Sequence, residues 1–89
     1  MSHKWHVIIE RSPQKVLRKL DTVMRSRIEK AIDQLSENPF PIGHRKIVGQ
    51  ENIYRVRIGG WRIIYEVEKG KLIILIIEIA PRGKAYRNF

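Results

Sequence analysis

Three arginines in the middle of the chain are spaced so that a β-hairpin would bring them together. Arg55 and Arg57 alternate with apolar residues, and Arg62 follows the pair Gly59–Gly60. If the two glycines form the turn, Arg57 lies directly opposite Arg62, and side chains directly opposite each other share one face of a sheet. Like charges in this position repel each other, and guanidinium groups bind phosphate oxygens two at a time. We therefore predict that this face binds a polyanion, specifically RNA.

The same arginines are also compatible with two ordinary roles. They could be solvent-facing charges, which need no binding partner. Glu66 falls on the same face as Arg62 and could neutralise one of them. Either role would leave a surface without a specific anion site.

The C-terminal segment carries a second set of residues with the same chemistry. It leaves the last predicted strand at Pro81 and has one tyrosine among the bases Arg82, Lys84 and Arg87. An exposed aromatic ring beside cations can stack on a nucleobase while the cations hold phosphates. We therefore expect Tyr86 to stack on a base, with Lys84 and Arg87 binding RNA. The alternative is that Tyr86 only packs the tail onto the core.

The overall charge of the chain also favours an acidic partner. Its 89 residues include 18 Lys and Arg against 9 Asp and Glu, a formal net charge of +9. Solubility needs only a few charges of either sign, so an excess of this size favours a polyanion over a generally basic, solvated surface. Much of the excess lies in residues 39–62 and after Glu78. Arg45 and Lys46 belong to the first stretch, and we expect them to extend the contact with RNA.

Composition excludes several other kinds of site. The chain has no cysteine, which excludes disulfides, thiolate metal sites and cysteine nucleophiles. His3, His6 and His44 have no matching carboxylate pattern, so we expect neither a metal nor a cofactor. The start of the chain lacks the apolar core of a signal peptide, the longest apolar run (Leu72–Ile77) is too short to cross a bilayer, and the helical region is too weakly basic for a membrane-surface role. We expect one soluble, cytoplasmic domain over residues 1–89.

Two helices are predicted between residues 12 and 37. Ser12–Pro13 indicates a helix start, with the serine as side-chain cap and the proline at the first helical position. Asp21 can cap a second helix, so we predict a helical hairpin over residues 12–20 and 22–37, ended by Asn38–Pro39. Apolar residues recur every three or four positions along both helices, which predicts a stripe that packs on the core.

The remaining segments alternate with a period of two and predict strands. We expect strands at residues 5–10, 54–58, 61–67 and 72–79. In the last segment, residues at odd and at even positions are apolar, so side chains on both faces of the strand are apolar. We therefore expect this strand to be covered on both faces and central in the sheet. The predicted fold is therefore α+β, with an N-terminal strand, a helical hairpin and a mainly antiparallel sheet of three to four strands. The hairpin side chains expected to meet the helices are Tyr54, Val56, Ile58, Trp61, Ile63 and Tyr65.

In these residues the chain resembles the RelE/ParE toxin superfamily, and within it the RelE branch. The resemblance spans nearly the whole length, and the order of its motifs is fairly specific although each motif alone is weak. The segments that carry it are the opening strand, Lys19-Leu20-Asp21, Asn38-Pro39, Lys46-Ile47-Val48-Gly49, Tyr54-Arg55-Val56-Arg57, Gly60-Trp61-Arg62-Ile63-Ile64-Tyr65 and the tail from Arg82 to Tyr86.

The resemblance implies an activity and a partner. It implies an mRNA endonuclease that acts in the ribosomal A site without a metal and is silenced by a cognate RelB-like antitoxin. In such enzymes the 2′-hydroxyl attacks the adjacent phosphate and leaves a 2′,3′-cyclic phosphate and a 5′-hydroxyl. It also implies that Arg62 and Arg57 stabilise the transition state with Arg55 beside them, that Arg82 holds the leaving-group side, and that Tyr86 aligns the base.

The identity of the general base is the point at which this chain departs from the family pattern. Some members have lysine at the positions of Arg55 and Arg57, and other branches use Glu or His, whereas arginine stays protonated and accepts a proton poorly. His44 precedes the constellation, and we interpret it as a loop residue. The pattern thus supports charge stabilisation well and general-base catalysis poorly. Either Tyr86 or a ribosomal group assists, or turnover is slow.

Two further functions are compatible with the same residues. A ParE-like toxin would bind gyrase and have no nuclease activity, and a non-catalytic basic RNA-binding module would bind RNA without stopping growth. In the toxin case we expect an acidic or amphipathic segment of the antitoxin to cover the basic cleft.

Overall fold

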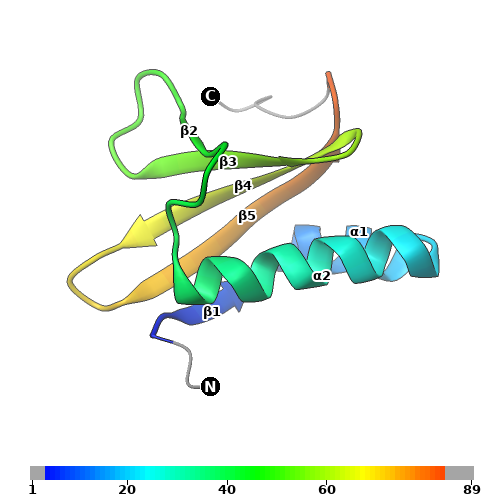
Figure 1. The fold of residues 1–89 in the computed structure, drawn as a ribbon, viewed down its shortest axis with the longest axis horizontal. Helices are drawn as coiled ribbons and strands as arrows, with labels where there is room; N and C mark the ends of the chain where they lie inside the picture. The colour runs from blue at the N-terminus through cyan, green and yellow to red at the C-terminus, as the bar shows by residue number, and fades with distance from the viewer. Residues whose placement is uncertain (1–3, 84–89) are drawn as a thin grey trace.

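The computed structural model describes residues 4–83 of the chain, and its two helices and five strands form an α+β fold (Figure 1). The predicted fold class is confirmed. The elements in chain order are β1 (His6–Ile9), α1 (Arg11–Lys19), α2 (Thr22–Glu37), β2 (Arg45–Lys46), β3 (Ile53–Ile58), β4 (Trp61–Glu68) and β5 (Ile73–Pro81).

The five strands form a single sheet in the order β1-β5-β4-β3-β2. The strands from β2 to β5 pair antiparallel, whereas β1 joins the sheet at its other edge by pairing parallel to β5. A parallel pair needs a long crossover connection, and the helical hairpin between β1 and the later strands is part of that crossover. The sheet thus places the N-terminal and C-terminal strands side by side.

The first helix starts earlier than predicted. It begins at Arg11, and its N-cap Glu10 makes no side-chain cap hydrogen bond, so the predicted cap at Ser12 with Pro13 at the first helical position is wrong. The reason is that Glu10 N–H still donates to Ile76 C=O of β5 at 3.1 Å, which leaves no loop between strand and helix. Pro13 lies within the first turn, where its missing N–H breaks no helical hydrogen bond.

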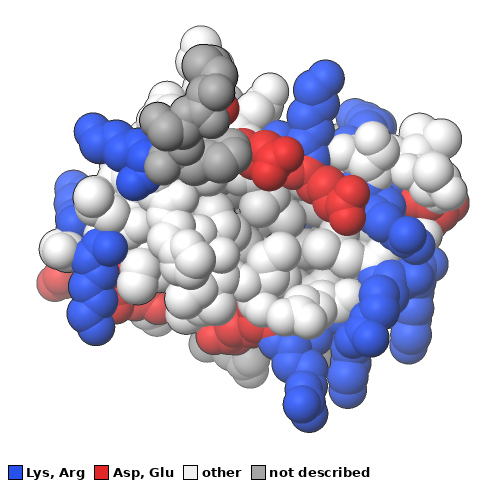
Figure 2. All heavy atoms as spheres, turned by 90° about the horizontal axis from the view of Figure 1, so that it is seen from below, with Lys and Arg blue, Asp and Glu red and all other residues white. Residues whose placement is uncertain are grey.

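The surface on the side of the molecule where α1 lies is rich in Lys and Arg (Figure 2).

The junction between the helices forms as predicted at Asp21. The Asp21 carboxylate accepts from Met24 N–H at 2.8 Å and caps α2. The guanidinium of Arg25 turns back to the end of α1, where it donates to the carbonyls of Leu17, Arg18 and Leu20 at 3.0–3.1 Å. The last carbonyls of a helix lack hydrogen-bond partners within the helix. Arg25 of α2 supplies donors to them, and these hydrogen bonds hold the end of α1 against the start of α2.

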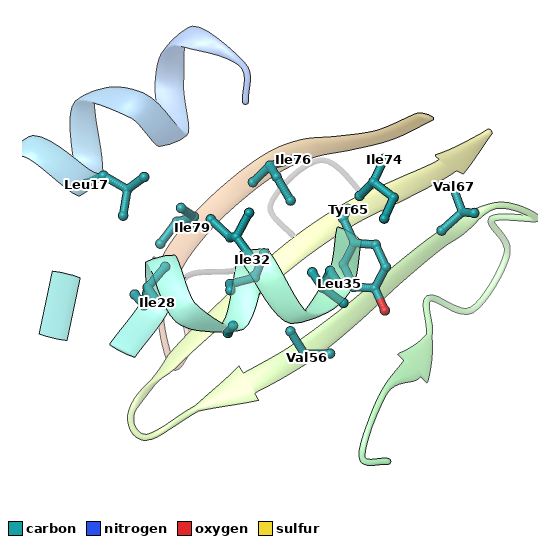
Figure 3. Close-up of a cluster of buried hydrophobic side chains, with 12 residues drawn as sticks. Leu17, Ile28, Ile32, Leu35, Val56, Tyr65, Val67, Ile74, Ile76 and Ile79 are labelled. Atoms are coloured by element: carbon teal, nitrogen blue, oxygen red, sulfur yellow. The ribbon is translucent and has the colours of Figure 1, made fainter. Parts of the chain in front are cut away.

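Both helices pack on one face of the sheet and form the core with it (Figure 3). The predicted apolar face of the hairpin takes part as expected, with Val56, Ile63 and Tyr65 buried and Tyr54, Ile58 and Trp61 packed at the margin. The buried members of the core are Leu17, Ile28, Ala31, Ile32, Leu35, Val56, Ile63, Tyr65, Val67, Ile74, Ile76 and Ile79.

The helices leave the opposite face of the sheet uncovered. A small apolar cluster of Ile47, Ile64 and Ala80 lies on that face. Strand β5 is interior, between β1 and β4, as the sequence indicated, but the helices cover only one of its faces. Ile73 and Leu75 on the other face are half-buried, so the expected cover of both faces is complete only on the helix side.

A buried tyrosine ties the loop after α2 to the sheet. The Tyr65 hydroxyl donates to Pro39 C=O at 2.6 Å, and the Tyr65 side chain is fully buried. Burial, followed by the neighbouring Tyr54 phenol, raises the pKa of Tyr65 far above its ordinary value. The hydroxyl therefore stays a donor in the folded protein. Because tyrosine in the unfolded chain ionises near pH 10, we expect stability to fall as the pH rises above about 10.

Replacing Tyr65 with phenylalanine is expected to lower the free energy of unfolding by about 1–3 kcal/mol, because Pro39 C=O then loses its buried donor. Urea denaturation measures the change. Tyr54→Phe is the matched control, since the Tyr54 ring stacks on Tyr65 at 6.0 Å between ring centres but its hydroxyl is not part of this bond. An equal loss in both variants would contradict the role given to the Tyr65 hydroxyl.

Candidate functional site

The predicted register of the β3–β4 hairpin is confirmed. Ile58 pairs with Trp61, Arg57 with Arg62 and Val56 with Ile63. Gly59 has φ +60°, a conformation that glycine adopts without strain and that two-residue hairpin turns require. Arg57 and Arg62 therefore share the face of the sheet that the helices leave uncovered.

A fourth arginine joins this face from the edge strand. Arg45 of β2 pairs with Arg55 of β3, and paired residues share a face. We call this side of the sheet the arginine face, defined by Arg45, Arg55, Arg57 and Arg62. Lys46 was predicted to act with them, but it pairs with Tyr54, so strand alternation places it on the other side. Five basic residues before the C-terminal tail were predicted to act on RNA, and the sheet thus brings four of them together on one face.

Arg62 differs from the other arginines because it is buried. Its side chain is only 8% exposed, and its Nε and Nη1 atoms are buried with no hydrogen-bond partner among the described residues. Strand β4 lies between β3 and β5, and the small residue Ala80 lies opposite Arg62. Buried donors without hydrogen-bond partners are costly, and such exceptions in native proteins need a physical reason. An anion that enters this face would supply the missing acceptors.

A cleft of about 390 Å³ borders the arginine face at the outer edge of β3. It opens there because β2 pairs only with Tyr54 and Arg55, so the rest of β3 has no neighbouring strand on that side within the described residues. Arg45, Arg55 and Arg57 line the cleft together with α2 and the Pro41–Gly43 loop. Its volume lies in the range of small-ligand sites, which is adequate for a nucleotide.

The start of the C-terminal tail is held beside the hairpin turn. Arg82 N–H donates to Gly60 C=O at 2.8 Å, and the Arg82 side chain is exposed. This contact brings the predicted Arg82 close to the row formed by Arg57 and Arg62. The other predicted tail residues, Lys84, Tyr86 and Arg87, lie outside the described residues.

The sequence interpretation missed one residue of this face, Glu78. Strand β5 has an irregularity where Ile64 pairs with Glu78 but the next residue, Tyr65, pairs with Ile76. The extra residue, Ile77, reverses the alternation, so Glu78 lies on the arginine face and Ile79 enters the core. Bulges of this kind redirect side chains beside active sites. The signal in the sequence was a single acid inside the apolar run 72–79.

Glu78 lies close enough to Arg62 for both to meet one ligand. Arg62 pairs with Ala80, which makes Glu78 its diagonal neighbour on the same face. Diagonal neighbours are about 7–8 Å apart, within reach of long side chains. The face therefore combines cations that can bind a phosphate with a carboxylate that can accept a proton.

The histidine nearest the site has a structural role, as expected. His44 Nδ1 lies 2.7 Å from Pro41 C=O, and its ring contacts Phe40 and Tyr54. Within residues 4–83 there is no group of three His, Asp or Glu side chains that could hold a metal ion. None of the helices in this range is long and apolar enough to cross a membrane.

Known proteins resemble the chain over almost its whole length. A family model described as the ParE toxin of the type II toxin–antitoxin system parDE matches residues 7–86. The RelE1 protein of Methanocaldococcus jannaschii is 33% identical over 88 residues, which cover 96% of this chain and 98% of that protein. The toxin RelE of Mycobacterium tuberculosis is 28% identical over 86 residues, which cover 96% of this chain and 89% of that protein.

Solved structures agree with these sequence matches. A chain in the crystal structure of the archaeal RelE–RelB complex from Pyrococcus horikoshii superposes with a TM-score of 0.81 at 30% identity, covering 92% of this chain and 99% of that one. The isolated E. coli RelE toxin superposes with a TM-score of 0.78 at 20% identity, covering 92% and 88%. The second likeness concerns the fold alone.

Proposed function

Because the chain belongs to the RelE/ParE superfamily of type II toxin–antitoxin toxins, we propose that it is an endoribonuclease that cleaves mRNA in the ribosomal A site. The observation that carries this proposal is the buried guanidinium of Arg62, whose Nε and Nη1 have no hydrogen-bond partner within residues 4–83, on a face with three further arginines. Burying these groups without acceptors is costly, and a bound phosphate would supply the acceptors.

The arginine face suits the charge that develops during RNA cleavage. When the 2′-oxygen attacks the adjacent phosphorus, negative charge grows on the non-bridging phosphate oxygens. Donors that are fixed in place stabilise this state more than the substrate. We assign this role to Arg62 and Arg57, with Arg55 binding the neighbouring phosphate. The P–O5′ bond then breaks and leaves a 2′,3′-cyclic phosphate and a 5′-hydroxyl.

The reaction also needs an acceptor for the 2′-hydroxyl proton. Arginine cannot serve because it stays protonated, but Glu78 places a carboxylate on the same face. We assign proton acceptance to Glu78, in place of the tail tyrosine or ribosomal group expected from the sequence. The leaving 5′-oxygen takes its proton from water, and we assign to Arg82 at the hairpin turn a hydrogen bond that stabilises the charge on this oxygen.

A cognate antitoxin is the expected partner. The Pyrococcus horikoshii structure is a RelE–RelB complex, and we propose that this chain likewise assembles with a RelB-like antitoxin. An acidic or amphipathic antitoxin segment would cover the arginine face and its cleft. Co-purification from cells expressing both proteins tests the pairing, and two separate peaks in gel filtration would contradict it.

Replacing Arg82 with alanine is expected to abolish translation arrest without unfolding the protein. The main-chain N–H of Arg82, which bonds to Gly60 at 2.8 Å, survives in alanine, and the exposed side chain contributes little to packing. Growth after induction measures arrest, and circular dichroism checks the fold. Lys71→Ala, at an exposed lysine in the β4–β5 turn, is the control and should arrest growth like the parent. An Arg82→Ala variant as toxic as the parent would contradict the assignment.

The matched family model is named for ParE, so a toxin that binds gyrase is the second candidate. Primer extension on mRNA from induced cells separates the two functions. Cuts in phase with codons support the ribosome-dependent nuclease, whereas DNA damage without mRNA cuts supports the gyrase-binding function. RNA binding without growth arrest would support neither toxin.

A further inference from the structure

The turn between β3 and β4 is in contact with a basic side chain of α2. A Cβ atom at Gly59 would lie 3.3 Å from Nη1 and 3.5 Å from Nη2 of Arg27, so the Arg27 guanidinium lies against this turn. The Arg27 side chain is exposed, and Figure 1 shows the β3–β4 turn and the N-terminal half of α2 at the same end of the molecule. Helix α2 thus places a cation at the turn of the hairpin that carries Arg57 and Arg62.

Arg27 also extends one wall of the cleft at the outer edge of β3. Ala31 of α2 and Ile58, the last residue of β3, both line this cleft. Arg27 lies one helical turn before Ala31, and Gly59 directly follows Ile58. The Arg27 guanidinium therefore lies at the end of the cleft nearest the hairpin turn, away from Arg45 of β2.

The charge of Arg27 has no acidic neighbour on its own helix. The positions three and four residues away, which are its neighbours on the helix surface, are occupied by Val23, Met24, Lys30 and Ala31. The terminal methyl carbon of Met24 would lie 3.6 Å from the same Cβ atom at Gly59, so an apolar contact holds this part of α2 on the turn. A cation that is held near its binding position loses less conformational entropy when it binds an anion.

The roles assigned to the other arginines set the direction of the RNA strand. Arg57 and Arg62 meet the reacting phosphate, with Arg55 on the phosphate before it. Arg82, whose main-chain N–H bonds to the hairpin turn, meets the leaving 5′-oxygen. That oxygen belongs to the first nucleotide on the 3′ side of the cut, so this nucleotide lies at the turn. The phosphate that follows it comes beyond the turn, where Arg27 lies.

We propose that Arg27 binds the phosphate that follows the first nucleotide on the 3′ side of the cut, and thereby holds the downstream mRNA. The inference rests on the proposed function, because the cleavage reaction sets the direction of the strand. A guanidinium matches two oxygens of one phosphate, and backbone contacts of this kind fix the position of a nucleic acid without reading its sequence. Arg27 is thus a substrate-binding residue outside the arginine face.

The test measures cleavage of ribosome-bound mRNA at several concentrations of the protein, with the protein in excess. Arg27→Gln removes the charge and keeps a good helix former, and circular dichroism checks its fold. We expect the protein concentration that gives the half-maximal rate to rise about tenfold or more, as for the loss of a hydrogen bond to a charged group. The rate at saturation should stay close to that of the parent. Arg27→Lys keeps the charge and should recover part of the loss.

Lys30→Gln is the matched control, because it removes one charge from an exposed position of the same helix. Its half-maximal concentration should stay within about twofold of the parent value. Equal weakening in Arg27→Gln and Lys30→Gln would overturn the proposal, since the effect would then come from net charge.

An altered mRNA identifies the phosphate that Arg27 binds. A methylphosphonate at the proposed position replaces one charged oxygen with a methyl group and leaves the rest of the strand unchanged. With this mRNA the parent should lose as much as Arg27→Gln loses with ordinary mRNA, and the variant should lose nothing more. If the two losses added instead, Arg27 would act on a different group and the proposal would be overturned.

The outcomes also distinguish this inference from the proposed nuclease. If the parent cuts mRNA and Arg27→Gln cuts it with the same concentration dependence, the nuclease stands and the role of Arg27 fails. The role of Arg27 also fails if this variant cuts like the parent but no longer binds the antitoxin, because the end of the cleft would then belong to a protein partner. If the parent does not cut ribosome-bound mRNA, both fail.

Discussion

Replacing Arg62 with methionine is expected to abolish translation arrest while leaving the fold as stable as the parent or more stable. The two effects have one cause. The guanidinium is 8% exposed, and Nε and Nη1 have no hydrogen-bond partner within residues 4–83, so the folded protein carries the cost of burying these two groups, which a bound anion would offset. Methionine fills a similar volume without charged or strongly polar atoms, and removing the buried unsatisfied groups should raise the free energy of unfolding by up to about 3 kcal/mol.

The expected loss of activity follows from the same position. A preorganised donor to a developing oxyanion contributes about a hundredfold to a thousandfold in rate. Cleavage of mRNA on purified ribosomes measures this loss, and urea denaturation measures stability. Substitutions that raise stability and lower activity are typical of functional sites. The side chains at these sites are required for the reaction but lower the stability of the folded state.

Arg57→Met is the matched control, because Arg57 pairs with Arg62 on the same face but is exposed. It should lower cleavage without raising stability, since its side chain is exposed and its removal relieves no buried group. If Arg62→Met destabilised the protein by several kcal/mol, the guanidinium would be a structural group with partners in solution. If the variant still arrested translation, the central assignment of the site would be wrong.

The hairpin could be predicted from the sequence because its determinants are local. Gly59–Gly60 fixes the turn, and alternation with period two fixes which side chains share a face, so the pairing of Arg57 with Arg62 follows without knowledge of the rest of the fold. The Asp21 cap was predictable for the same reason, since it depends on residues three positions apart.

Other features depend on contacts between distant segments and could not be predicted in this way. Arg62 is only 8% exposed on β4, which lies between β3 and β5, and no local pattern specifies that strand order. Helix α1 begins early because Glu10 remains bonded to β5. Glu78 reaches the arginine face through an irregularity at Ile64 and Tyr65, whereas regular alternation along β5 would have turned it toward the helices.

Glu78→Gln is expected to slow mRNA cleavage on ribosomes by about a hundredfold or more, the usual contribution of a general base. Glutamine keeps the size and hydrogen-bonding oxygen of the side chain but cannot take the 2′-hydroxyl proton. Binding to the ribosome should stay unchanged, because the arginines that hold the phosphates remain.

Two further variants separate proton acceptance from a purely structural role of Glu78. Glu78→Asp keeps the carboxylate and should recover part of the rate that Glu78→Gln loses. Glu66→Gln removes another acid on the same side of β4, opposite Ile53 and Leu75, and should leave the rate within twofold. A Glu78→Asp enzyme that recovers none of the rate lost in Glu78→Gln would mean that Glu78 only orients the arginines. The proton would then pass to a group outside the arginine face.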